Sequence, residues 1–352
     1  MQQKLKVLDC TLRDGGLALE DFHKNGLNTP VFNEEDRKMI SNHVRDAGID
    51  IIEIGCMSEN EAVKGFAISK NIEMLSKYIP ERTNQNQIFV GLYRGPDTDL
   101  SKIPEHKPEL LDGVRVILRY SELQKSLDYC SALSEKGYKV FVQPMLTMRY
   151  PDSELDQIID ASNTMNAYAL YFVDSFGYMN ESDIDRLFYY YKERLSPDIK
   201  IGFHAHNNLD MAFSNARYFI DKLQGRDKII DSCAIGMGQG AGNLQTETVV
   251  YYLNQAHAAN YNLNHVLAVC DILEKFRPYD MWTWGYSPVR LIPAMYNTAY
   301  KYAVALHIQY HMSLVEINKI LCDIPEDLRH RYTPENLKKI LRNHNVPITR
   351  QF

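Results

Sequence analysis

The stretch Lys6-Val7-Leu8-Asp9-Cys10-Thr11-Leu12-Arg13-Asp14-Gly15-Gly16 indicates which fold this chain adopts. Its start is apolar, as in a buried strand, and its end carries charged residues and two glycines. A doubly wound nucleotide-binding sheet would show a Gly-x-Gly-x-x-Gly fingerprint after its first strand, and this stretch does not. We therefore expect the first strand to belong to a closed parallel barrel and to end at its open mouth.

Strand and helix signals alternate over the first 260 residues. Apolar, β-branched runs occur at residues 5–9, 50–55, 88–92, 114–118, 139–143, 169–173, 199–203 and 230–235. The amphipathic stretches between them are Glu34–Ala47, Glu59–Tyr78, Ser121–Lys136, Ser153–Asn166, Glu181–Arg194, Leu209–Leu223 and Asn243–Ala259. Strands separated by helices form βαβ units and a parallel sheet. Eight such units predict an α/β fold, the (β/α)8 TIM barrel.

Beyond residue 260 the pattern changes to helices alone. We expect helices at Leu263–Phe276, Pro288–His307, Ser313–Cys322 and Pro334–Asn343. A barrel of typically ~250 residues accounts for the first part of the chain. We therefore expect a TIM-barrel domain at 1–260 and a helical C-terminal extension at 261–352, which acts as a lid or an interface.

The composition excludes several classes of protein. The net charge is −6 and the pI is about 6.0, which argues against a general nucleic-acid binder. No apolar run approaches the ~20 residues of a membrane span, and no signal peptide precedes the first strand. The six cysteines include no Cys-x-x-Cys pair, which fits a reducing compartment. We expect a cytoplasmic protein that binds neither nucleic acid nor membrane.

His204-Ala205-His206 is the first candidate metal motif. Side chains alternate along a strand, so both imidazoles point to the same face, about 6–7 Å apart. Two neutral imidazoles at this spacing can bind one metal. Asp14, just past the first strand, adds a hard anionic ligand. Alone, the two histidines are also explained as polar side chains satisfied at a strand end, so the prediction depends on the whole set.

The glycine-rich segment Gly236-Met237-Gly238-Gln239-Gly240-Ala241-Gly242-Asn243 follows the expected eighth strand. A parallel barrel often keeps its anion site in this loop. We expect Gly240 to contact the substrate there. The first, seventh and eighth strands are neighbours once a barrel closes, so this loop, the two histidines and Asp14 should meet at one mouth.

Together these fragments resemble the DRE-TIM metallolyases, the HMGL-like superfamily. Its members carry Arg-Asp-Gly after strand one, His-x-His-Asn after strand seven and a loop ending in Gly-Asn after strand eight. Here Arg13-Asp14-Gly15, His204-Ala205-His206-Asn207 and Gly242-Asn243 stand in that order. The chain is most similar to the 4-hydroxy-2-oxovalerate aldolases, which share Asp174-Ser175 and an extension opening with Gly285-Tyr286.

The resemblance implies an activity and further site residues. Ser175 would bind the substrate carboxylate, Tyr286 would border the substrate, and Asn243 would be a further metal ligand. An alternative for Asn243 is the N-cap of the helix that follows it. The metal would be Mn²⁺ or Mg²⁺, with Co²⁺ or Zn²⁺ as alternatives. The substrates would be a 2-oxoacid such as pyruvate and an aldehyde, and the expected partners are an aldehyde dehydrogenase and further copies of this chain.

The chemistry can be argued from the roles of the residues. Three protein ligands leave open positions on the metal, where a 2-oxoacid can chelate. The metal then stabilises the enolate that forms when a carbon–carbon bond breaks. Arg13 can donate to the developing oxyanion, although a salt bridge at the barrel mouth is its alternative role. Glu53 is an acid inside a strand and needs a cationic partner, so we expect it to orient Arg13.

One position departs from the aldolases. Their acid–base histidine, two residues after Arg-Asp-Gly, is Leu17 here, which cannot transfer a proton. The segment 17–30 offers Glu20, Asp21 and His23 as replacements, and we name His23 as the candidate. Three other functions remain open: a Claisen-type enzyme joining an acyl-CoA to a 2-oxoacid, a ferrous oxygenase, and a non-catalytic barrel that binds a partner enzyme.

Overall fold

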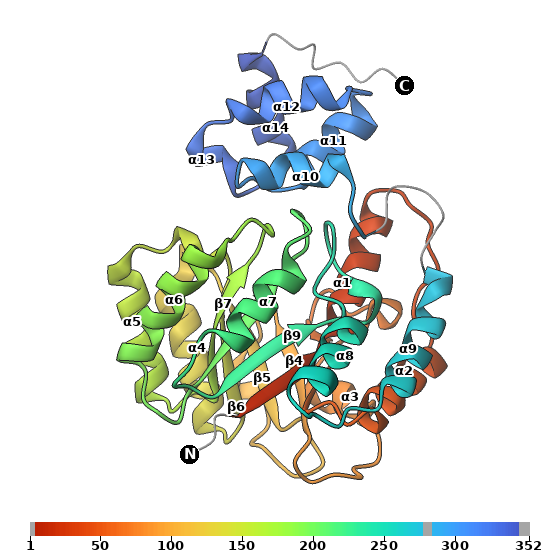
Figure 1. Cartoon of the computed structure of the whole chain (residues 1–352), viewed down its shortest axis with the longest axis vertical. Helices are drawn as coiled ribbons and strands as arrows, with labels where there is room; N and C mark the ends of the chain where they lie inside the picture. Colours follow the sequence, from red (N-terminus) through yellow and green to blue (C-terminus); the bar gives the residue numbers. More distant parts are fainter. Residues whose placement is uncertain (1–3, 277–283, 345–352) are drawn as a thin grey trace.

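The chain forms a closed ring of parallel strands in a computed structural model that describes residues 4–276 and 284–344 (Figure 1). The strands of the ring are β1 (Leu5–Asp9), β2 (Ile51–Met57), β4 (Ile88–Tyr93), β5 (Gly113–Leu118), β6 (Lys139–Pro144), β7 (Ala169–Asp174), β8 (Lys200–Ala205) and β9 (Lys228–Ser232). Each pairs in parallel with its neighbour, and β1 pairs with both β9 and β2, which closes the ring. The predicted TIM barrel with C-terminal helices is therefore confirmed.

Helices cover the outside of this ring. Those of the barrel are α1 (Thr11–Lys24), α2 (Glu34–Asp46), α3 (Ile72–Ser76), α4 (Leu123–Glu135), α5 (Asp152–Thr164), α6 (Glu181–Arg194), α7 (Ala212–Asp221) and α8 (Thr246–Ala256). Asn33 and Asn180 form capping boxes that fix where α2 and α6 begin. The apolar faces of these helices pack on the strands in one continuous core. No helix within the described residues is long and apolar enough to cross a bilayer.

One expected helix of the barrel is wrong, and one helix was not expected. The stretch Glu59–Tyr78 is not one helix: it holds a 3-10 turn at Lys64–Phe66, the short strand β3 (Ile68–Ser69) and α3. Ala67 adopts a left-handed conformation and Asn71 caps α3, so the chain turns twice within this stretch. Helix α1, which contains Gly15 and Gly16, is not among the predicted helices.

Two further helix boundaries differ from the predicted ones. Helix α8 begins at Thr246 with Gln245 as its N-cap, not at Asn243. The predicted helix Pro288–His307 is two helices, α10 (Pro288–Met295) and α11 (Lys301–Gln309), and Asn297 between them has a positive φ of 49°. A left-handed residue cannot continue a right-handed helix, so the chain turns at this point.

The C-terminal helices form a separate body above the barrel (Figure 1). This body contains α10, α11, α12 (Leu314–Cys322), α13 (Glu326–Arg329) and α14 (Pro334–Asn343), which share their own apolar core. Helix α9 (Leu263–Leu273), by contrast, buries Val266, Val269 and Leu273 in the core of the barrel. We therefore propose a domain boundary between Phe276 and Val289, later than residue 260.

Candidate metal centre

Helix α1 carries the first two residues of the site. It begins at Thr11, immediately after β1, so Arg13 and Asp14 lie in its first turn at the mouth of the barrel. A carboxylate in a first turn is favoured by the partial positive charge of the helix N-terminus. Asp14 is 3% exposed and Arg13 is 8% exposed, and Arg13 Nη1 lies 2.8 Å from Asp14 Oδ1. The pair is therefore held together away from solvent.

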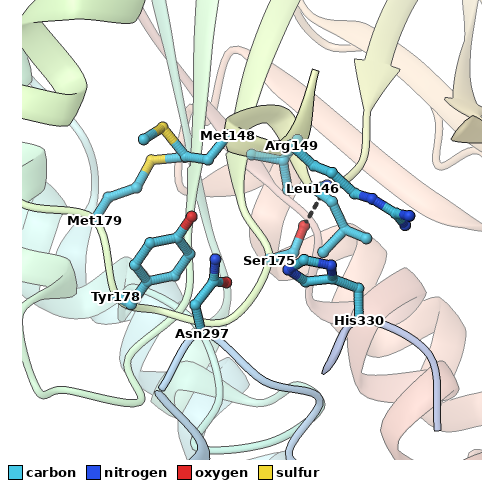
Figure 2. Close-up of a pocket in the computed structure, with 9 residues that line it drawn as sticks. Leu146, Met148, Arg149, Ser175, Tyr178, Met179, Asn297 and His330 are labelled. Carbon is cyan, nitrogen blue, oxygen red and sulfur yellow. Dashed lines mark hydrogen bonds between the residues drawn. The ribbon is translucent and has the colours of Figure 1, made fainter. Parts of the chain in front are cut away.

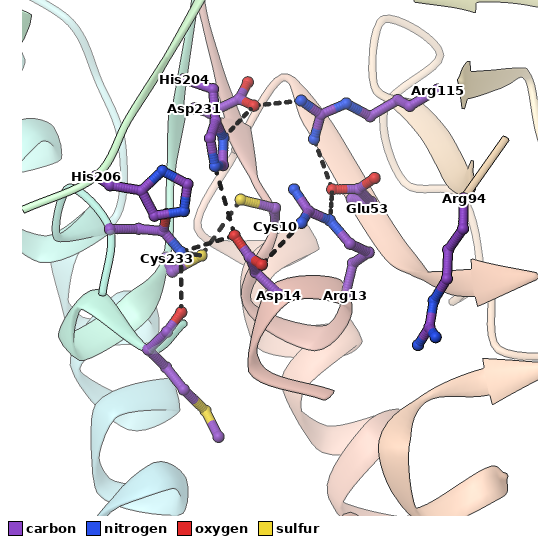
Figure 3. A network of polar contacts seen from close by, with 12 residues as sticks. Cys10, Arg13, Asp14, Glu53, Arg94, Arg115, His204, His206, Asp231 and Cys233 are labelled. Carbon is purple, nitrogen blue, oxygen red and sulfur yellow. Dashed lines mark hydrogen bonds and ion pairs between the residues drawn. The ribbon is translucent and has the colours of Figure 1, made fainter. Parts of the chain in front are cut away.

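Strand β8 brings two imidazoles to the same place (Figure 3). Asp14, His204 and His206 each offer a ligand atom, and these atoms all lie within 4.8 Å of one another. His204 Nδ1 lies 2.9 Å from Asp231 Oδ2, and His206 Nδ1 lies 2.8 Å from the Asp174 carbonyl oxygen. These contacts hold both rings by Nδ1 and leave Nε2 as the ligand atom, the arrangement that metal-binding histidines usually show.

The charges around these ligands favour their metal-binding forms. Burial would raise the pKa of Asp14, but Arg13 and His204 hold it well below its usual range. Burial and the charge of His204 lower the pKa of His206 to about 4, so this ring is neutral at pH 7. Burial would also lower the pKa of His204, but the carboxylates of Asp14 and Asp231 raise it well above its usual range. A metal at His204 therefore displaces a proton.

Asn243 joins the same cluster. Its Nδ2 donates to Asp14 Oδ2 at 2.8 Å and to the Met237 carbonyl oxygen at 3.2 Å. Its Oδ1 is buried and accepts no hydrogen bond from the described residues. The helix-cap alternative for Asn243 is wrong, because Gln245 is the N-cap of α8. A buried amide oxygen without a donor beside Asp14 fits a metal better, since buried polar groups are nearly always satisfied.

A chain of buried charges crosses the barrel interior from Arg13 to His204 (Figure 3). Arg13 Nε donates to Glu53 Oε2 at 2.9 Å, so the expected contact of these two residues is present. Arg115 Nη1 donates to the same Glu53 oxygen at 2.6 Å, and Arg115 Nη2 donates to Asp231. Each end of this chain therefore orients a residue of the cluster.

Sequence reasoning missed Arg115 and Asp231, and the thiols of Cys10 and Cys233, which lie 3.2 Å apart next to the cluster. No motif marks any of the four. The available signal was a charge inside an apolar strand, as in Val114-Arg115-Val116 and Ile230-Asp231. Such a residue needs a partner of opposite charge when it is buried.

Ser175, which directly follows β7, lies in a small pocket (Figure 2). It accepts a hydrogen bond of 2.8 Å from the Leu146 N–H, and the pocket, with a volume of about 10 Å³, is also lined by His330 and Tyr178. This volume holds about one water molecule. The expected role of Ser175 in binding a substrate carboxylate stays a prediction.

His23 and Tyr286 do not join the metal cluster. His23 Nε2 lies 2.8 Å from the Thr29 carbonyl oxygen, and the ring packs against Phe66. Nine residues separate it from Asp14 along α1, so it projects about 180° away from that side chain. The side chain of Tyr286 is 58% exposed. The contact of this segment with the glycine-rich loop is made by the backbone N–H of Gly285, which donates to the Ala241 carbonyl oxygen.

Another tyrosine of the extension faces the barrel. The Tyr300 hydroxyl donates to Asp21 Oδ2 at 2.5 Å, and Lys301 Nζ lies 2.6 Å from Asp21 Oδ1. Tyr300 also lies against Gly240 of the glycine-rich loop. Asp21 follows Asp14 by seven residues, which places both on one face of α1 about 10 Å apart along its axis. Glu20, another of the proposed bases, forms ion pairs with Arg94 and Lys24.

Comparison with known proteins agrees with this geometry. A family model described as HMGL-like matches residues 4–274. A 4-hydroxy-2-oxovalerate aldolase of Thermomicrobium roseum is 29% identical over 71% of this chain and 67% of its own. An oxaloacetate decarboxylase of Mycobacterium tuberculosis is 27% identical over 74% and 73%. The crystal structure of the N-terminal domain of a Bacteroides vulgatus protein has a TM-score of 0.68 at 23% identity, covering 88% of this chain and 99% of that one; at this identity the likeness concerns the fold.

Proposed function

Because the chain belongs to the HMGL-like family, the DRE-TIM metallolyases, we propose that it is a metal-dependent aldolase acting on a 2-oxoacid and an aldehyde. Enzymes of this family are metal-dependent carbon–carbon lyases. The similarity to 4-hydroxy-2-oxovalerate aldolases supports the aldolase assignment. The observation that carries the proposal is the buried cluster of Asp14, His204 and His206 with Arg13 beside it.

The residues of the cluster fit a divalent metal. Asp14, His204 and His206 would hold it, with Asn243 Oδ1 as a fourth ligand, and a mixed nitrogen and oxygen set suits Mn²⁺ or Mg²⁺, with Co²⁺ or Zn²⁺ as alternatives. When bound, the metal supplies Lewis-acid polarisation of the 2-oxo group. The Asp231 carboxylate and the Asp174 carbonyl oxygen keep the two imidazoles oriented for it.

Arg13 binds and stabilises the substrate oxygen on which negative charge develops. Its Nε is fixed by Glu53 and its Nη1 by Asp14, so the guanidinium has one orientation before substrate arrives. A donor held in advance stabilises a transition state without reorganisation at the moment of reaction.

Asp21 and Tyr300 are the acid–base pair that we propose for the aldehyde half of the reaction, in place of His23. Burial and the Asp21 carboxylate raise the pKa of the Tyr300 hydroxyl well above its usual range, so it stays a proton donor at pH 7. Its proton lies on the hydrogen bond to Asp21 Oδ2. During cleavage the tyrosine oxygen takes the proton of the substrate hydroxyl as its own proton passes to Asp21 Oδ2, and during synthesis both protons move back.

Exchange of the methyl protons of pyruvate with deuterium oxide tests the donor half without any aldehyde. We expect exchange in the presence of Mn²⁺ or Mg²⁺, and none with a chelator. Asp14→Ala, His204→Ala and His206→Ala should each lose exchange and bound metal together, while Arg186→Gln, an exposed residue on α6, should keep both. Normal metal content in the three folded ligand variants would contradict the site.

Decarboxylation of a 2-oxoacid is a second candidate function. The similarity to an oxaloacetate decarboxylase points to loss of CO₂ from a 2-oxoacid, which needs the same cluster and Arg13. It needs no proton transfer to an aldehyde oxygen. Tyr300→Phe therefore separates the two functions, because it should impair aldol cleavage and leave decarboxylation of oxaloacetate intact.

A further inference from the structure

A cavity of about 290 Å³ lies between the barrel and the C-terminal helices. Its barrel wall is the second half of α1 with Gly240, and its other wall comes from α10 and α11. The volume is near the lower limit of ~300 Å³ for small-molecule pockets. Positive charges dominate its lining, which includes Lys24, Arg290 and Lys301 against one acid, Asp21.

Arg290 is the unusual residue of this wall. It is 6% exposed, yet the only hydrogen bond of its side chain within the described residues is a long one of 3.3 Å from Nη1 to the Gly285 carbonyl oxygen. Its Nε is buried and has no acceptor among these residues. Burial lowers the pKa of Arg290 to about 10, so the group still carries its charge at pH 7. A buried guanidinium without a carboxylate partner is costly unless something else neutralises it.

The other charges of the cavity are already matched. Lys301 pairs with Asp21 at 2.6 Å, and Lys24 pairs with Glu20 at 3.1 Å. Asp21 is thus occupied by Lys301 and the Tyr300 hydroxyl, so among the described lining residues Arg290 is the buried cation without a carboxylate partner. Guanidinium groups match carboxylate and phosphate groups because their planar donors bind two oxygens at once.

The cavity is also next to the elements that carry the metal ligands. Asp21 lies two turns beyond Asp14 on the same helix, a rise of about 10 Å. Gly240 lies three residues before Asn243 in the glycine-rich loop. A substrate that reacts at the metal and extends past Asp21 and Tyr300 would enter the cavity that Arg290 also lines.

We propose that this cavity binds an anionic group, a carboxylate or a phosphate, at the far end of the aldehyde substrate, with Arg290 as its principal counter-charge. This rests on the proposed aldolase function and specifies its aldehyde as negatively charged. A neutral short aldehyde leaves the buried guanidinium without a partner. We therefore expect the site to discriminate strongly between charged and neutral aldehydes. A ligand that leaves a buried polar group without a partner loses much of its binding energy.

Matched aldehydes test the proposal by steady-state kinetics with pyruvate and metal. One arm compares succinic semialdehyde with butanal, and the other compares glyceraldehyde 3-phosphate with glyceraldehyde. We expect kcat/KM to be at least 10-fold higher for the charged member of one pair, and the pair that shows it identifies carboxylate or phosphate. Arg290→Gln should abolish that ratio, and Arg290→Lys should restore part of it.

Two further measurements keep the test independent of folding and of turnover. Lys24→Gln removes a 60% exposed charge from the same cavity and should reduce the ratio by a smaller factor, whereas Arg186→Gln, on α6 and outside the cavity lining, should leave it unchanged. Calorimetry with succinate and with inorganic phosphate measures binding of the anion alone in the wild type and in Arg290→Gln.

The outcomes separate the two hypotheses. Anion binding that depends on Arg290, without any pyruvate exchange, would refute the aldolase but retain the anion site. Pyruvate exchange with equal kcat/KM for charged and neutral aldehydes would overturn the anion site alone. Binding of succinate or phosphate that is equal in the wild type and in Arg290→Gln would also overturn it.

Discussion

At the scale of single residues, Arg13 connects the catalytic cluster to the barrel interior. Its guanidinium contacts both Asp14 and Glu53, and Glu53 is shared with Arg115. We expect Arg13→Lys to keep the fold and the metal but to lose roughly 2–4 kcal/mol of transition-state stabilisation, because an ammonium group cannot make both contacts and face the substrate. The measurement is kcat with pyruvate and aldehyde, alongside metal content. Turnover equal to wild type would leave Arg13 as an ion pair only.

Asp9 gives the protein a pH-dependent stability. Burial raises its pKa from 3.8 to about 6, although Thr246 and Thr11 donate to it. Because the folded pKa is higher than the unfolded one, the contribution of Asp9 to stability is full below pH 3.8 and is lost as the pH rises through about 6. The loss is about 3 kcal/mol. Asp9→Asn removes this dependence.

Urea unfolding of the wild type and of Asp9→Asn between pH 4 and pH 7.5 measures this effect. We expect the wild type to weaken relative to the variant as the pH rises to about 6, and the difference to stay constant above pH 7. Parallel pH profiles of the two proteins would contradict the raised pKa.

The residues of the cluster differ in how far they could be predicted. Asp14, His204 and His206 follow from short-range geometry, since alternation along a strand and position at its end bring them to one mouth. Arg115 and Asp231 act through contacts between β5, β2 and β9, and no local pattern encodes such distant partners. Tyr300 depends on how the C-terminal helices dock, which the order of helices along the chain does not specify.

At the scale of elements, α1 is the helix that the sequence did not predict and on which the site depends. Gly15 and Gly16 have low helix propensity, so the local pattern favours a loop. Close packing explains both glycines: a Cβ on Gly16 would clash with the Phe66 carbonyl oxygen, and one on Gly15 would lie 2.6 Å from the sulfur of Met237. Tertiary contact thus overrides propensity here.

These glycines give a matched pair of variants. Gly16→Ala meets backbone that cannot move, so we expect a loss of about 1–3 kcal/mol in stability and weaker metal binding as α1 shifts Asp14. Gly15→Ala meets a flexible side chain, and the better helix propensity of Ala offsets part of its cost by up to about 1 kcal/mol. Thermal unfolding and metal titration measure both effects. Equal losses in the two variants would show that backbone packing at Phe66 is not the constraint.

At the scale of the whole molecule, the described residues of the barrel and of the C-terminal helices have separate apolar cores of unequal size. The barrel core spans β1 to α9 together with Trp284, and the C-terminal core lies within residues 289–341. Among the described residues, the two bodies meet through the contacts of Tyr300 and Lys301 with Asp21, and through Phe176, which packs against the C-terminal core. A small core opens at lower free energy than a large one.

Hydrogen exchange measured by mass spectrometry tests this hierarchy. We expect amides of α11 and α12 to exchange through openings of lower free energy than those of β7 and β8, and Tyr300→Phe to accelerate exchange in α10–α14 while the barrel strands keep their rates. The reason is that loss of the hydroxyl leaves Asp21 with Lys301 alone and weakens the docking of the helices on α1. Ser131→Ala, a half-buried hydroxyl on α4, is the control and should change neither body. Equal opening free energies in both bodies would mean that barrel and extension unfold as one unit, in which case the C-terminal helices cannot open independently to admit an aldehyde.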